Sequence, residues 1–94
     1  MPIFAVHYTY SAATAPARDE HRPAHRAWLS GLVDQGVVLS TGPYPDGSGA
    51  LILFRAADAA AMEKLLAEDP FARQGVIDAK RFVQWQPVMG AFAD

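Results

Sequence analysis

Two side chains of this sequence have the chemistry needed for acid–base catalysis: the imidazole of His25 and the carboxylate of Asp69. An imidazole exchanges a proton near neutral pH. A carboxylate beside it orients the ring, selects its tautomer and favours its charged form. Because the two residues lie far apart in the chain, the pair forms only if the fold brings them together.

The first part of the sequence predicts a strand followed by a helix. β-Branched and aromatic residues from Ile3 to Tyr10 are typical of a strand, and the segment "SAATAPA" (Ser11 to Ala17) is typical of a loop. Pro23 suits the first turn of a helix, where a missing N–H has no consequence, and Gly36 suits its end. The apolar residues of this helix recur with the helical period and are Trp28, Leu29, Leu32 and Val33.

The remainder predicts two strands, a second helix and a last strand. Val37 to Thr41 and Ala50 to Arg55 are typical of strands, and the turn-forming segment "GPYPDGSG" (Gly42 to Gly49) joins them. Asp58 can cap a second helix. Ile77 to Val88 predicts the last strand. The apolar stripe of the second helix consists of Met62, Leu65 and Leu66.

This βαββαβ order predicts an α+β, ferredoxin-like fold: a four-stranded antiparallel sheet with two helices on one face. Both faces of the first strand are apolar, because Phe4, Val6 and Tyr8 alternate with Ile3 and Ala5. The helices cover only one of these faces. We therefore expect a homodimer packed sheet to sheet, of the dimeric α/β barrel type.

Strand and helix directions in this fold bring several segment ends to one end of the sheet. His25 precedes Trp28 by three residues, and Asp69 follows Leu65 by four, so each polar residue continues an apolar helix face at that end. We expect His25 and Asp69 to act as a catalytic pair there. The expected substrate-binding residues at the same end are Tyr8, Pro43 and Phe71 as walls and the backbone near Gly42 as a carbonyl-polarising group.

Structural roles compete with this interpretation. Asp69 stands directly before Pro70, which also makes it a good N-cap for a short helical turn. A histidine on an apolar stripe is often a buried structural residue. The start of a helix near His25 disfavours a charged imidazole, whereas a neighbouring carboxylate favours it, and the sequence leaves open which effect is larger.

Three other groups of residues receive non-catalytic interpretations. His21 and His25 have the spacing of metal ligands on a helix, but Pro23 lies between them, so we expect His21 to precede the regular helix and predict no metal site. His7 is expected at the subunit interface or on the barrel-facing surface of the sheet. The basic residues near the first helix are expected to form a solvated face and are Arg18, Arg22 and Arg26.

Composition excludes several classes of function. The 94 residues carry a net charge of −2 and no cysteine, so we expect no binding to nucleic acid or to an anionic membrane, no disulfide and no thiolate chemistry. The N-terminal segment "MPIFAVHYTY" lacks the pattern of a signal peptide. No apolar run reaches the ~20 residues that span a bilayer. We expect a soluble, cytoplasmic protein in which residues 1–94 form a single domain.

Three segments together resemble the YCII-like family of small bacterial proteins: "RPAHRAWL" (Arg22 to Leu29), "GVVLSTGPYPD" (Gly36 to Asp46) and "DPFARQGV" (Asp69 to Val76). The resemblance implies a dimeric ferredoxin-like fold related to muconolactone isomerase. It also implies a histidine–aspartate active site at His25 and Asp69. The implied activity is a lyase-type elimination on small aromatic or lactone substrates, without a cofactor. Arg26 departs from the family pattern, which has an apolar residue there.

Two functions follow as hypotheses. The first is a cofactor-independent lyase or isomerase in which His25 moves a proton on a small cyclic or aromatic substrate and Asp69 holds the imidazole. The alternative is a non-catalytic module that binds a small ligand or regulates another process. A structural domain appended to a larger system ranks last.

Overall fold

The computed structural model describes residues 1–93. A short 3₁₀ turn, η1 (Ala12–Thr14), lies between the first strand and the first helix. The strands are β1 (Ile3–Thr9), β2 (Val38–Pro43), β3 (Gly49–Arg55) and β4 (Ala79–Trp85). The helices are α1 (Ala15–Asp34), α2 (Ala59–Ala67) and α3 (Pro70–Arg73).

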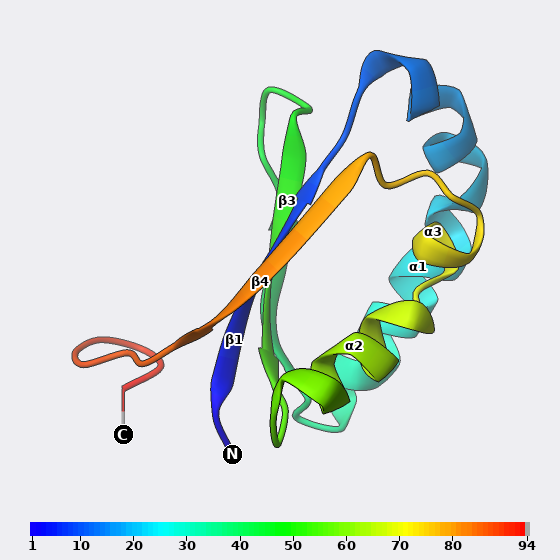
Figure 1. Cartoon of the computed structure of the whole chain (residues 1–94). Coiled ribbons are helices and arrows are strands. Elements are labelled where there is room, and N and C mark those ends of the chain that lie inside the picture. The colour runs from blue at the N-terminus through cyan, green and yellow to red at the C-terminus, as the bar shows by residue number, and fades with distance from the viewer. Residues whose placement is uncertain (94) are drawn as a thin grey trace.

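The four strands form one antiparallel sheet in the order β2-β3-β1-β4. Figure 1 shows all three helices on the same side of this sheet, with α1 and α2 lying along it. The α+β ferredoxin-like fold expected from the sequence is therefore confirmed. In this order β1 and β3 are the central strands, and β2 and β4 are the edges.

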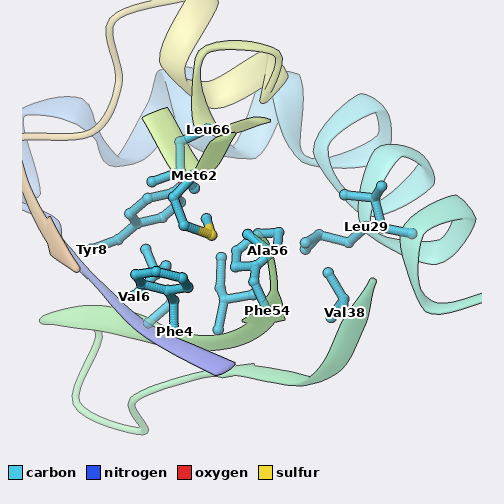
Figure 2. Packing of buried hydrophobic residues seen from close by; sticks show 12 residues of the cluster. Phe4, Val6, Tyr8, Leu29, Val38, Phe54, Ala56, Met62 and Leu66 are labelled. Carbon is cyan, nitrogen blue, oxygen red and sulfur yellow. The ribbon is translucent and has the colours of Figure 1, made fainter. Parts of the chain in front are cut away.

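The core lies between the helices and the inner face of the sheet. Side chains alternate between the faces of a strand, so every second residue of β1 and β3 points toward the helices. Figure 2 shows these side chains meeting those of the helices. Full burial of an aliphatic or aromatic side chain contributes about 1.5–3 kcal/mol, which fixes the register of each strand. The buried residues of this cluster include Phe4, Val6, Tyr8, Ile52, Phe54, Leu29, Leu32, Met62 and Leu66.

The opposite face of the sheet is also apolar, as the alternation in β1 predicts. Ile3, Ala5 and Leu53 project there and are buried. Val83 and Trp85 of the edge strand β4 share this face and are 49% and 41% exposed. Within residues 1–93 no helix covers this face (Figure 1).

The first helix begins earlier than the sequence predicts. We expected a loop over Ser11 to Ala17 and a helix start at Pro23, but α1 already begins at Ala15. Pro16 occupies its first turn, the position that favours proline, and Pro23 lies in the helix interior. Pro23 lacks the N–H that would bind the carbonyl of Asp19, and the burial of one face of α1 offsets this loss.

In the described part of the chain no helix is long and apolar enough to cross a membrane.

Other boundaries lie close to the expected ones. Gly36 has φ 75° and ends α1 as predicted. The side chain of Asp58 accepts a hydrogen bond from the backbone N–H of Ala61 and caps α2, also as predicted. The last strand is shorter than expected, because pairing with β1 ends at Trp85 and the chain leaves the sheet there.

Candidate active site

His25 lies in the interior of α1, on the face that packs against the sheet. It shares this face with Leu29 and Leu32, four and seven residues later, and its side chain is buried. Because α1 begins at Ala15, the expected effect of a helix N-terminus on the imidazole does not apply, since that effect falls off within the first turn. The environment of the ring is therefore set by its side-chain neighbours.

Asp69 is fully buried between α2 and α3. Its backbone is extended, and its side chain accepts a hydrogen bond from the backbone N–H of Phe71 at 2.9 Å, so it caps α3. Pro70 follows in the first position of that helix, where its fixed φ suits the turn. The N-cap role that the sequence allowed for Asp69 is thus present, and it directs the carboxylate inward.

The fold brings His25 and Asp69 into contact. Nδ1 of His25 lies 2.7 Å from Oδ1 of Asp69. An ionised carboxylate only accepts hydrogen bonds, so the hydrogen of a neutral imidazole lies on Nδ1 and the lone pair on Nε2. The capping role of Asp69 and its contact with His25 coexist, because one carboxylate accepts several hydrogen bonds.

Tyr8 holds the other oxygen of the same carboxylate. Its hydroxyl donates to Oδ2 of Asp69 at 2.7 Å, and the contact is buried. Burial raises the pKa of the Tyr8 hydroxyl above its ordinary value, and the negative charge of Asp69 raises it further. The hydroxyl therefore keeps its proton and remains a donor, so Asp69 is held by the side chains of Tyr8 and His25 and by the backbone of Phe71.

Aromatic rings fix the orientation of the imidazole. The ring of Phe71 is stacked on that of His25, with centroids 3.8 Å apart and 3° between the planes. Tyr10 meets the edge of Phe71 at a centroid distance of 6.2 Å. Rotation of the imidazole would break both this stack and the hydrogen bond to Asp69.

A cavity of about 340 Å³ adjoins the imidazole. Nε2 of His25 has no hydrogen-bond partner within residues 1–93, and no buried side-chain nitrogen or oxygen there lacks one, so Nε2 is not sealed from solvent. The cavity lies between α1 and the ends of β2 and β3 that face it. Its lining consists of Tyr10, His25, Arg26, Leu29, Ser30, Val33, Thr41, Gly42, Pro43 and Ala50.

The expected substrate-binding residues divide into two groups. Gly42 and Pro43 line the cavity. Tyr8 and Phe71 are absent from its described lining. The reason is that Tyr8 points into the core toward Asp69, and Phe71 packs on the imidazole.

Sequence reasoning missed most of the α1 residues of this cavity. Arg26, Leu29, Ser30 and Val33 follow His25 at spacings that keep them on one side of a helix. That helical spacing was the available signal. Tyr10 also lines the cavity, and nothing in the sequence distinguished it from Tyr8 as the tyrosine that does so.

Arg18 is not on a solvated face, contrary to expectation. Its side chain is buried, and its guanidinium lies 4.2 Å from the ring centroid of Tyr10. It donates hydrogen bonds to the backbone oxygens of Ser11 and Val76 and lies 3.8 Å from the carboxylate of Asp78. Because α1 starts before Arg18, the residue stands seven positions before His25 on the same buried helix face. From this position the guanidinium of Arg18 packs on the ring of Tyr10.

The remaining histidines lie away from this site. His7 projects from the outer face of the sheet and is bonded through Nδ1 to the Tyr44 hydroxyl at 2.9 Å. His21 lies within α1, so the expectation that it precedes the helix is wrong, because the helix starts at Ala15. Residues 1–93 hold no group of three or more His, Cys, Asp or Glu side chains suited to a metal ion.

Comparison with known proteins places the fold and the family. One similar solved structure is 5-chloro-2-hydroxyhydroquinone dehydrochlorinase from Burkholderia phenoliruptrix AC1100, in complex with 2,5-dihydroxybenzoquinone. The two structures superpose with a TM-score of 0.80 at 20% sequence identity, over 98% of this chain and 99% of that chain. No curated protein matches the sequence. The family model of the YCII-related domain matches residues 2–86, and the chain therefore belongs to the YCII-related family.

Proposed function

We propose that the protein is a cofactor-independent enzyme that moves a proton on a small cyclic or aromatic substrate, as a lyase or isomerase does. The observation that carries the proposal is the imidazole of His25, which is bonded through Nδ1 to the buried carboxylate of Asp69 and belongs to the lining of a cavity. This arrangement provides the base, the group that orients it and room for a ring.

In the proposed reaction, Nε2 of His25 takes a proton from a carbon of the substrate. The electron pair of the broken C–H bond forms a C=C bond, and the leaving group departs with its own bonding pair. In an isomerisation, the imidazolium instead returns the proton to a different carbon. Neither route needs an oxidant or a reductant. Asp69 stabilises the imidazolium that forms in between.

The cavity favours a compact, largely apolar substrate. Leu29, Val33 and Pro43 supply apolar surface beside the imidazole. Its volume of about 340 Å³ is at the small end of the ~300–1,000 Å³ range of ligand pockets. The backbone at Gly42 is the group we assign to polarising a substrate oxygen.

The structural neighbour supports a choice of first substrates. Its name describes the loss of HCl from a chlorinated hydroxyhydroquinone, which pairs proton removal with departure of chloride. At 20% identity the likeness concerns the fold. We extend the chemistry to this chain as part of the proposal, and the first panel to test is halogenated hydroquinones, halogenated phenols and small lactones.

The decisive variants are His25→Gln and Asp69→Asn, with His21→Gln as the matched control on the same helix. Loss of the base should lower kcat by about 10²–10⁴-fold. Asn caps a helix nearly as well as Asp, so Asp69→Asn should keep α3 and the far-UV circular dichroism while losing activity. His21→Gln should behave like the wild type. Normal turnover by both folded site variants would refute the proposal.

The alternative function, a non-catalytic ligand-binding or regulatory module, predicts a different outcome. In that case a ring compound binds in the cavity, and His25→Gln changes its affinity, but no compound of the panel is converted. Product analysis by NMR separates the two functions, because it detects conversion independently of binding.

We further propose that two copies of the chain pack through the outer faces of their sheets. The support is the apolar face that carries Ile3, Leu53, Val83 and Trp85, which a second copy would cover symmetrically. Val83→Arg should convert a dimer into a monomer in sedimentation equilibrium. Met89→Arg, on the exposed tail, should not. A monomeric wild-type protein at micromolar concentration would refute the dimer.

A further inference from the structure

The three arginines of α1 near the site have different surroundings. Arg18 is buried and bonded, and Arg22 forms an ion pair with Asp19 one turn before it. Arg26 is exposed, and within residues 1–93 it makes no ion pair. The charge of Arg26 is therefore available to a molecule from solution.

Arg26 lines the same cavity as His25. The side chain of Arg26 is also exposed, so the part of the lining that it forms is open to solvent. The lining in the described part of the chain includes no Asp or Glu, and the nearby carboxylate of Asp69 is covered by its hydrogen-bond donors. The mouth of an otherwise largely apolar cavity thus carries an uncompensated positive charge.

We infer that Arg26 selects substrates that carry a carboxylate on a small ring, with the ring in the cavity and the carboxylate on the guanidinium at its mouth. The inference rests on the proposed function for the use of the site and adds the class of substrate. The planar guanidinium fork matches a carboxylate with two parallel hydrogen bonds.

The same surroundings argue against a phosphate at this position. Phosphate sites combine several donors, often the free N–H groups at a helix N-terminus. Arg26 lies in the interior of α1, where the backbone N–H groups bond within the helix. A single guanidinium without backbone donors suits a singly charged carboxylate.

Binding of a matched pair of probes, benzoate and benzamide, tests the inference. The two molecules have nearly the same shape and differ in charge. Each is titrated into the wild type, Arg26→Gln, Arg26→Lys and Arg22→Gln, with backbone amide shifts in NMR as the readout. Arg22→Gln is the matched control, because it removes a charge from the same helix one turn away from the cavity lining.

We expect the wild type to bind benzoate about threefold to tenfold more tightly than benzamide, the range of a partly exposed charged contact. Arg26→Gln should abolish this preference, so that it binds benzoate and benzamide equally. Arg26→Lys should keep part of the preference, and Arg22→Gln should keep all of it. The preference should weaken as salt is added.

Three outcomes would overturn the inference: equal binding of the two probes by the wild type, a preference that survives in Arg26→Gln, or no binding of benzoate at millimolar concentration. These outcomes are distinct from failure of the proposed function. Because the readout is binding, a protein without turnover can still meet the expectation. An active enzyme that prefers neutral rings contradicts it.

Discussion

Phe71 holds both members of the candidate pair: its ring is stacked on the imidazole of His25 at 3.8 Å, and its backbone N–H donates to the carboxylate of Asp69 at 2.9 Å. Phe71 follows Asp69 in the short helix α3, so the turn that caps this helix also supplies the surface on which the imidazole rests. The geometry of the pair therefore depends on a local turn as well as on the packing of α1.

Replacement of Phe71 by leucine tests this dependence. Leucine keeps this buried position apolar, and a single substitution of this kind typically costs about 0.5–3 kcal/mol of stability, so the protein should remain folded. The flat surface under the imidazole is lost, and the ring of His25 should gain mobility, with broader imidazole signals in NMR. Phe82→Leu, an aromatic residue packed on Phe4 away from the site, is the control. Equal imidazole spectra in both variants would show that the stack has no orienting role.

Tyr8→Phe removes one donor from the buried carboxylate of Asp69 and leaves the ring in the core. A buried acceptor that loses its partner costs about 1–3 kcal/mol, so the urea midpoint of unfolding should fall. Tyr44→Phe is the matched control, because its hydroxyl contacts His7 in a partly buried position on the outer face. Equal loss of stability in the two variants would contradict a larger contribution of the buried Tyr8–Asp69 hydrogen bond.

Residue 49 lies in β3, which pairs with β1, so a methyl group at this position should disturb the strand that carries Tyr8. A Cβ on Gly49 would lie 1.9 Å from the backbone oxygen of Tyr8, so Gly49→Ala must displace the strand that carries the Tyr8 hydroxyl. We expect a large loss of thermal stability. Gly31→Ala is the control: the space around Gly31 is open, and alanine stabilises a helix interior by roughly 0.5–1 kcal/mol relative to glycine. A tolerated Gly49→Ala would contradict the close pairing.

Alkaline titration should detect the burial of the tyrosines beside Asp69. Burial, followed by the charge of Asp69, raises the pKa of Tyr10 from 10.0 to about 12, although Arg18 and Arg22 act in the opposite direction. A raised tyrosine pKa contributes stability that is complete below pH 10 and is lost as the pH rises toward 12. The ultraviolet absorbance of tyrosinate should therefore appear at higher pH in the native protein than in the protein unfolded in urea. Coincident curves would contradict this environment.

The sequence was sufficient to predict the order of elements and the meeting of the two elements that carry His25 and Asp69. The alternation of apolar residues in β1 and the helical stripes determine which faces are buried, and strand directions then follow from the order. The start of α1 could not be read in the same way. Two prolines compete for the first turn, and the helix that starts in the turn of Pro16 brings Arg18 onto the buried face of α1.

The partners of the carboxylate were also beyond the sequence. Tyr8 and Tyr10 are two residues apart in the sequence, yet the first bonds Asp69 in the core and the second lines the cavity. The end of β1 at Thr9 separates their environments, because Tyr10 has already left the sheet. Such a division depends on side-chain packing at the end of a strand, which periodicity does not encode.

The central claim is that Asp69 holds the hydrogen of the imidazole on Nδ1 and leaves the lone pair of Nε2 toward the cavity. Long-range ¹H–¹⁵N NMR of His25 in its neutral form measures this directly. We predict a protonated, pyrrole-type Nδ1 and an unprotonated, pyridine-type Nε2 in the wild type. We also predict a shift toward the other tautomer in Asp69→Asn. A wild-type imidazole with its hydrogen on Nε2 would contradict the account.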